Sequence, residues 1–551
     1  MLVAAVLHLL WAVFFATDGG DMAAQYAWAE FVGAHPGSAY NLSWYGGMHP
    51  VSYSVLTPYL MAWLGVRTTA VMAGIFSAAV LARLLMRSGI DRPLYPAVWG
   101  AFALSCDTAS GRITFSVGVL FGLAATLVVY ESVGGRFARN VGAFVLGVIA
   151  ACSSPVAGLF LLVAGVALFL TGRRKESFAL LAGPPLVVGV ATLLFPFYGV
   201  QPFSVGGAAL VAATALPIAV WAPKSWRPVR AGAWVYIAGD LLTLAVPSPI
   251  GSNVERLALL FAAMVLLAAV PALPHGRQRL AVLLAFVFAA GWQVVKPVQD
   301  LVSTASAASW SEYAKPLIVE LGRLGADRGR VEAVAAKTHW ESAGLSPYVD
   351  LARGWNRQLD VERNPVFYDG KLTPATYHAW LRRWAVTYVV LPDAAPDSAA
   401  AAEARIVMAG QPWLRPVWRD AHWRMYAVAD AVPLTSAPST VARAGQGELR
   451  VRVPEAGSFL VRVAWSPWLG VSGGPGCLER EGEWTRLRAR DAGVFRIGGS
   501  YRIPRGTPCG DAAPGTSPRV PRSTITSLPA LSTSRRGRHL LDQGETVPDT
   551  A

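Results

Sequence analysis

Long apolar stretches separated by short polar loops fill residues 1–297, and they constrain the fold of this chain more than any other feature. A helix needs about 20 residues to cross the hydrocarbon core of a bilayer, where the backbone satisfies its polar groups only within a helix or a closed barrel. The whole chain is 54% hydrophobic and 15% charged, and most of its acids come after residue 297. The sequence therefore predicts a mainly α polytopic transmembrane bundle with eleven spans, at 2–17, 68–86, 94–108, 113–130, 141–154, 156–171, 177–198, 203–222, 230–247, 255–271 and 279–297.

Basic residues alternate between the predicted loops, as the positive-inside rule requires of a correct set of spans. This alternation predicts that the N-terminus is cytoplasmic and that residues from 298 onward lie outside the cell membrane. Residues 1–17 could instead be a cleaved signal peptide, although no basic leader precedes them and no small-x-small site follows them; the missing leader also fits a start that has lost a few cytoplasmic residues. The basic loops contain Arg83, Arg87 and Arg92; Arg136 and Arg139; Arg173, Arg174 and Lys175; Lys224, Arg227 and Arg230; and Arg277 and Arg279.

The part of the chain after residue 297 has the pattern of a water-facing region. Residues 298–432 predict an extracytoplasmic α/β domain, because apolar residues recur first at helical spacing and then in short β-type runs. The expected elements are a helix at 313–325, a strand at 330–336, a helix from 372 with Thr373 as N-cap, a strand at 386–391 and a hairpin at 414–430.

Residues 433–508 alternate apolar and polar side chains between turns, in "ELRVRV", "SFLVRVAW" and "VFRIGG". This period of two predicts a small β-rich domain, a sandwich. The following residues, 509–551, are rich in Ser, Thr, Pro, Arg and Gly and predict a disordered basic tail. Cys477 and Cys509 are a disulfide candidate because an external region permits the bond, whereas no metal-ligand spacing of cysteines is present.

The formal net charge of +14 does not point to nucleic acid, because the cations lie in the predicted cytoplasmic loops and the tail without interleaved aromatic residues. Anionic lipid headgroups are the simpler partner. The sequence contains no Gly-x-x-x-x-Gly-Lys-Ser/Thr loop and no strand-linked Gly-x-Gly-x-x-Gly, so a nucleotide-binding fold is not expected.

Two aspartates, Asp18 and Asp21, follow the first apolar segment in "TDGGDMAAQ". They open a long first external loop, 18–67, whose amphipathic "MAAQYAWAEFV" and aromatic "WYGGMHPVSYSVLTPYL" stretches suit a membrane interface. Together with the short paired helices predicted around "CSSPVAG" and the external C-terminal region, these features resemble the GT-C superfamily of polytopic membrane glycosyltransferases over residues 1–430. The resemblance implies a carboxylate here that acts as general base or helps hold a divalent cation, Mg or Mn, and a donor sugar on a polyprenyl phosphate.

The residues themselves suggest a division of roles. A partly desolvated carboxylate has a pKa suited to accepting the proton of an acceptor hydroxyl, which favours Asp21 as base and Asp18 as its partner or as a helix cap. Arg256 and Arg112 lie at predicted outer helix ends, where a guanidinium can hold a departing phosphate or simply reach lipid headgroups. Further substrate-binding candidates are Gln25, one helical turn after Asp21, and Tyr45 and His49 in the aromatic stretch, while the polar and aromatic stretches 339–341 and 352–360 are sugar-compatible or core.

The sequence thus predicts a membrane glycosyltransferase that transfers a sugar from a polyprenyl-phosphate donor to a cell-envelope acceptor on the outer face of the membrane. A multi-span transporter of envelope precursors is the first alternative, although no repeat relates the two halves of the bundle. A noncatalytic membrane scaffold with a glycan-binding external domain is the second.

Overall fold

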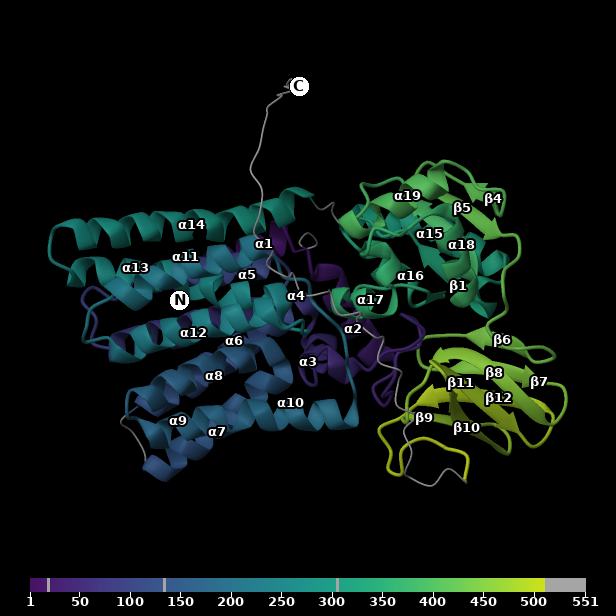
Figure 1. Ribbon diagram of the computed structural model, residues 1–551, viewed down its shortest axis with the longest axis horizontal. Coiled ribbons are helices and arrows are strands. Elements are labelled where there is room, and N and C mark those ends of the chain that lie inside the picture. The colour runs from purple at the N-terminus through teal and green to yellow at the C-terminus, as the bar shows by residue number, and fades with distance from the viewer. Residues whose placement is uncertain (17–19, 132–134, 304–306, 511–551) are drawn as a thin grey trace, which may run out of the picture. The chain divides into compact units, whose positions relative to one another are not determined.

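The computed structural model describes residues 1–16, 20–131, 135–303 and 307–510 (Figure 1). Residues Met1–Cys509 form one compact unit. Two expectations lie outside the described residues: the placement of Asp18, and the disordered tail beyond Gly510.

The N-terminal region is mostly helical, and a helix occupies every segment in which the sequence predicts a span, the segment at 177–198 being divided between two helices. Six segments of the described residues are long and apolar enough to cross a membrane: Val66–Arg87, Ile113–Tyr130, Arg136–Ser153, Arg174–Leu194, Gly251–Ala272 and Arg277–Val302. The chain is therefore a multi-pass membrane protein, and the expected number of eleven spans is not confirmed. The helices are α1 Leu2–Phe14, α2 Met22–Ala34, η1 Pro50–Ser52, α3 Thr57–Leu64, α4 Val66–Arg87, α5 Leu94–Ala109, α6 Ile113–Tyr130, α7 Arg136–Ser153, α8 Pro155–Leu170, α9 Arg174–Leu181, α10 Gly183–Leu194, α11 Val205–Trp221, α12 Arg227–Ala245, η2 Gly251–Val254, α13 Glu255–Ala269, η3 Val270–Ala272 and α14 Arg277–Ser303.

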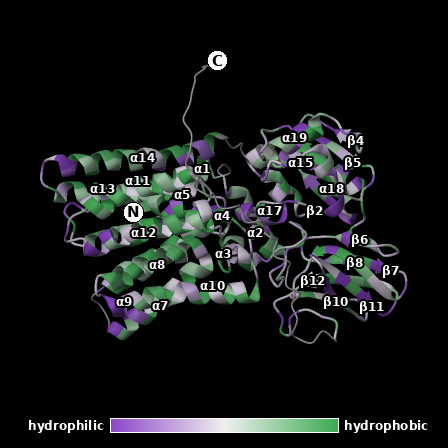
Figure 2. Ribbon diagram, in the orientation of Figure 1, coloured by the Kyte–Doolittle hydropathy of each residue, from purple (hydrophilic) through white to green (hydrophobic). Residues whose placement is uncertain are grey.

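Figure 2 shows these helices as predominantly hydrophobic ribbons, with hydrophilic residues concentrated near their ends. The break predicted at "CSSPVAG" is present, because α7 ends at Ser153 and α8 starts at Pro155. A break leaves carbonyl groups without helical partners, and the first loop supplies the donors: Val55 N–H to Cys152 O at 2.9 Å and Ser54 Oγ to Ser153 O at 2.8 Å. The first loop is thereby fixed against the bundle.

The α/β region follows, with α15 Ala307–Arg323 leading into a five-stranded sheet of order β2-β1-β3-β5-β4. Strands β1, β2 and β3 are parallel, and the β4–β5 hairpin adds two antiparallel strands. The strand at 386–391, the hairpin and the helix capped by Thr373 are all confirmed, the last with Pro374 at its first position. The elements are η4 Ala326–Arg328, β1 Arg330–Ala333, α16 Trp340–Leu345, β2 Asp350–Leu351, α17 Arg357–Arg363, η5 Pro365–Phe367, α18 Pro374–Arg383, β3 Val386–Pro392, η6 Ser398–Ala400, α19 Ala401–Met408, β4 Leu414–Arg419 and β5 Trp423–Val428.

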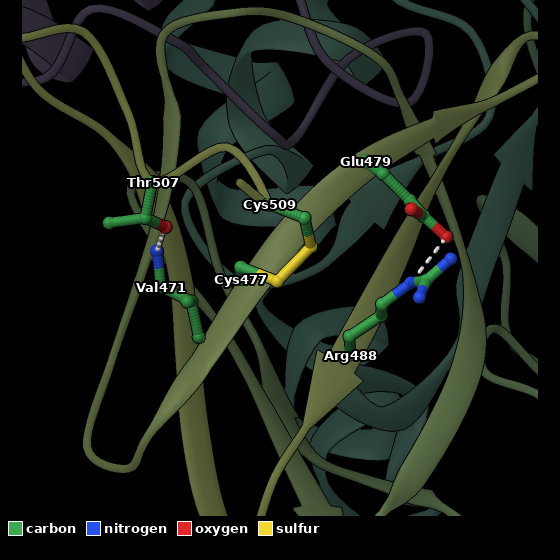
Figure 3. Close-up of a disulfide and its surroundings, with 6 residues drawn as sticks. All are labelled: Val471, Cys477, Glu479, Arg488, Thr507 and Cys509. Atoms are coloured by element: carbon green, nitrogen blue, oxygen red, sulfur yellow. Dashed lines mark hydrogen bonds and ion pairs between the residues drawn. A yellow bond between two sulfur atoms is a disulfide. The ribbon is translucent and has the colours of Figure 1, made fainter. Parts of the chain in front are cut away.

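Two further sheets share one apolar core and form a β-sandwich. Cys477 is joined to Cys509 by a disulfide that ties β10 to the segment after the last strand (Figure 3). One sheet has the order β10-β11-β8 and the other β6-β7-β12-β9. Their strands are β6 Thr440–Ala444, β7 Leu449–Val453, β8 Gly457–Ala464, β9 Leu469–Ser472, β10 Gly476–Glu481, β11 Trp484–Ala489 and β12 Gly493–Gly499.

The aromatic first loop differs from the expectation that it lies on or in the membrane surface. Trp28, Trp44 and Tyr45 are buried in one cluster with Leu351 and Val390 of the sheet. The Trp44 indole N–H donates to Ser342 O at 3.2 Å, so the indole polar group is also satisfied within the protein. The aromatic content of this loop is explained by packing against the α/β region.

Candidate functional site

A cavity of about 570 Å³ opens where the ends of bundle helices meet the α/β region. Its lining combines the start of α2, the starts of α6, α8 and α13, the end of α14, and the segments 337–339 and 355–358. The cavity contains both signs of charge, and acids and bases from distant parts of the sequence meet there. These are Asp21, Glu255, Asp300 and Asp397, together with Arg112, Arg256, Lys296, Lys337, His339 and Arg357.

Asp21, the predicted base, lies in this cavity and forms an ion pair with Arg256, with its Oδ2 3.5 Å from the guanidinium. Asp21 occupies the N-cap position of α2, yet its side chain makes no capping hydrogen bond. The carboxylate is 33% exposed and Arg256 is 18% exposed, so both remain open to a ligand. Arg256 is further held over the ring of Phe115, at 5.3 Å from the ring centre.

The turn between α5 and α6 fixes the backbone at Asp21. Gly111 has φ +74, and a Cβ there would lie 2.6 Å from Met22 N and 3.1 Å from Asp21 C. Ser110 O in the same turn accepts a hydrogen bond from Asp21 N–H at 3.3 Å. Only glycine tolerates both the left-handed backbone and this close approach, so the sequence "SGR" helps to set the position of the carboxylate.

Arg112, the second predicted phosphate holder, also lines the cavity. Its guanidinium lies 3.7 Å from the buried carboxylate of Asp107, which also accepts a hydrogen bond from Ser116 Oγ at 2.8 Å. Asp107 is thus placed to orient the Arg112 guanidinium.

Helix α14 adds an ion pair that the sequence did not single out. Lys296 Nζ lies 3.1 Å from Asp300 Oδ1, at the i, i+4 spacing of neighbours on one helix face. A Cβ at Gly20 would lie 3.8 Å from the Asp300 carboxylate, so this pair is adjacent to the loop that carries Asp21. The only feature of the sequence that could have indicated this pair is a lysine near the end of an apolar helix.

The α/β region supplies the opposite wall of the cavity. Trp355 donates its indole N–H to Gly20 O at 3.2 Å, and the His339 ring stacks on Trp355 with centroids 3.4 Å apart. Arg357 pairs with Asp397 at 2.8 Å. Burial opposes ionisation of Asp397, but Arg357 and His339 lower its pKa on balance.

Both stretches that the sequence marked as sugar-compatible, 339–341 and 352–360, therefore contribute cavity residues. Lys337 lines the same wall and is exposed. An aromatic face beside cationic and hydrogen-bonding groups is the kind of surface that suits a sugar ring next to an anionic group.

Three predicted ligand residues lie outside the cavity lining. Tyr45 is fully buried and its hydroxyl donates to Gly354 O at 2.7 Å. His49 is buried between Ala39 O, 2.8 Å from Nδ1, and Ser466 Oγ, 3.2 Å from Nε2. Gln25 donates to the Tyr53 hydroxyl at 2.6 Å, and Tyr53 in turn lines the cavity. Tyr45 and His49 thus hold the first loop by hydrogen bonds, whereas Gln25 uses its amide nitrogen and its buried Oε1 has no hydrogen-bond partner among the described residues.

The divalent cation stays an expectation. In the part of the chain that the structure describes, no three His, Cys, Asp or Glu side chains are grouped as metal ligands. Asp21 is turned toward Arg256, and Asp18 lies outside the described residues.

Comparisons with known proteins place the chain as follows. Residues 436–514 match a family described as a domain of unknown function, DUF8823. No curated protein matches the sequence. A solved structure of the arabinofuranosyltransferase AftD from Mycobacteria aligns at 16% identity with a TM-score of 0.44, over 78% of this chain and 39% of that one.

A mutant of that enzyme aligns in two classes, both at 15% identity. One class has a TM-score of 0.45 over 78% of this chain and 41% of that chain, and the other 0.44 over 81% and 42%. The chain spans about two fifths of the length of these structures. The neighbours are glycosyltransferases, the class of enzyme that the sequence resembles.

Proposed function

We propose that this protein is a membrane glycosyltransferase that moves a sugar from a polyprenyl-phosphate donor to a cell-envelope acceptor in the cavity between the bundle and the α/β region. The observation that carries the proposal is the pairing of a partly exposed carboxylate, Asp21, with the guanidinium of Arg256 inside a cavity that bundle helices line. The external face is the proposed location, because the basic loops lie at the opposite ends of the helices.

In the proposed reaction the acceptor hydroxyl oxygen bonds to the anomeric carbon of the donor sugar while the bond from that carbon to the phosphate oxygen breaks. The polyprenyl phosphate leaves with the bonding electron pair, and the hydroxyl proton passes to Asp21. Arg256 and Arg112 face the developing phosphate charge, where a preoriented guanidinium stabilises the transition state more than water does. A divalent cation, if bound, would assist at the same phosphate.

Asp21→Asn tests the base directly. The amide keeps the size of the side chain but cannot accept a proton, so we expect turnover of polyprenyl-phosphate sugars to fall by at least about a hundredfold, the low end of general base contributions. Arg256→Gln should lower turnover by a similar factor. Protein in lipid nanodiscs is incubated with these donors and envelope acceptors, and release of polyprenyl phosphate is measured.

Asp91→Asn is the matched control, because Asp91 is exposed and does not line the cavity; its turnover should equal that of the parent. Unchanged turnover in Asp21→Asn with an intact fold would rule Asp21 out as the base. Movement of a solute across sealed vesicles without chemical change would instead establish the transporter alternative.

A further inference from the structure

A row of arginines crosses the outward face of the four-stranded sheet of the β-sandwich. Arg443 on β6, Arg450 on β7 and Arg496 on β12 lie directly opposite one another on neighbouring strands. Arg452 lies two residues along β7 and so shares the face. We call these four residues the arginine face.

The arginine face carries much more positive than negative charge. Arg443, Arg452 and Arg496 are exposed and Arg450 is half-buried. Glu448 pairs with Arg450 at 2.6 Å, whereas no ion pair within the described residues involves the other three arginines. Like charges directly opposite on adjacent strands destabilise a sheet, so the bare protein gains no stability from this arrangement.

The other sheet of the same sandwich provides a contrast. Two outward arginines of its strand β11 pair with glutamates of the neighbouring strand β10: Arg488 donates to Glu479 at 2.9 Å (Figure 3), and Arg486 pairs with Glu481. These two arginines are therefore neutralised within the protein, and a third on the same sheet, Arg462 of β8, donates to Pro433 O. Within the described strands, arginines directly opposite one another therefore occur on the four-stranded sheet and not on the three-stranded one.

We infer that the arginine face binds an extended anionic glycan, a polysaccharide that carries carboxylate or phosphate groups. Guanidinium forks match the planar oxygen pairs of such groups, and the strand spacing of about 4.8 Å sets the arginines in a line rather than a pocket.

A glycan fits this face better than a membrane surface. The other outward residues at these strand positions include Thr440, Ser472 and Val494, of which only Val494 is an exposed large apolar residue, so little could insert into lipid. The inference does not rest on the proposed transfer reaction.

Binding of the full chain, in nanodiscs of zwitterionic lipid, to polygalacturonate tests the inference. We expect saturable binding that weakens as salt screens the charges. The affinity should fall at least about tenfold in the triple variant Arg450→Gln, Arg452→Gln, Arg496→Gln, because losing even one charge-assisted contact changes affinity by about that factor. A polyphosphate chain should bind in the same way as polygalacturonate, and neutral dextran should not bind.

The matched control is the double variant Arg486→Gln, Arg488→Gln, whose arginines are already paired; it should bind within about twofold of the parent. Equal loss in both variants, equal binding of dextran, or binding to phosphatidylglycerol vesicles but not to the polymers would each overturn the inference. Thermal unfolding of every variant verifies the fold, and since no turnover is measured, the outcome is independent of the catalytic proposal.

Discussion

Single residues set the geometry of the cavity because the backbone and charged neighbours restrain them. Asp21 is positioned by the glycine turn at Gly111 and faces Arg256, while Asp107 orients Arg112. Removing one partner of such a pair leaves a charge without compensation in a partly buried place. We therefore expect the positioning residues to matter for turnover as much as the residues that would contact substrate.

Gly111→Ala tests this positioning. The added methyl would meet Met22 N at 2.6 Å, so the start of α2 and Asp21 should shift, and turnover should fall at least about tenfold. Gly89→Ala is the matched control, because Gly89 also has positive φ, +67, but no atom lies within 4 Å of the added carbon. Both variants should lose about 1 kcal/mol from backbone strain; equal turnover in the two would contradict the positioning role.

At the scale of elements, one buried arginine joins three parts of the α/β region. Arg353, after β2, pairs with Asp360 of α17 at 2.8 Å and with Glu403 of α19 at 2.9 Å, and lies 3.6 Å from Glu332 of β1. Burial, and then the charge of Glu403, raises the pKa of Glu332 well above its usual value. The network therefore depends on Arg353 to keep several buried carboxyl groups compensated.

Arg353→Met should destabilise the α/β region by about 3–5 kcal/mol, the cost of leaving buried charges unpaired. Hydrogen exchange of the α17 and α19 amides should increase accordingly. Arg405→Met, on the exposed side of α19, is the control and should change exchange little. Unchanged protection in Arg353→Met would show that the network does not hold these helices.

At the scale of the whole Met1–Cys509 unit, the first loop links the β-sandwich to the rest. The Tyr40 hydroxyl donates to Ala464 O at 2.9 Å, and His49 contacts Ser466. The end of α10 adds a direct contact, because the Trp468 indole N–H donates to Leu194 O at 2.8 Å. Burial lowers the pKa of His49 from 6.5 to about 4. This junction should therefore depend on pH.

The direction of this pH dependence follows from the lowered pKa of His49. Folding favours neutral His49, so its contribution to the free energy of unfolding is complete above pH 6.5. That contribution is lost as the pH falls toward 4, by roughly 3 kcal/mol over the interval. His49→Gln should flatten the fall of the melting temperature between pH 7 and pH 4.5, and His275→Gln, an exposed histidine, should not. Identical pH profiles for the parent and His49→Gln would contradict this account.

The sequence alone predicted most of the elements, because local patterns produce them. Apolar runs placed a helix in every expected span segment, the proline at 155 placed the break between α7 and α8, and Thr373 with Pro374 placed the start of α18. Period-two alternation likewise predicted the sandwich strands. Two of the predicted site residues, Arg112 and Arg256, line the cavity with Asp21 because α2, α6 and α13 all begin there.

Only the tertiary structure decided the rest of the site. Lys296, Lys337 and Arg357 come from separate elements, and no spacing in the sequence relates them to Asp21. Tyr45 and His49 have side chains suited to a ligand, yet packing of the first loop against the α/β region and the sandwich uses their polar groups. Gln25 is buried, and its amide nitrogen donates to Tyr53 of the same loop. Local sequence thus determined which elements form, whereas long-range packing decided which of their polar groups stay free for a substrate.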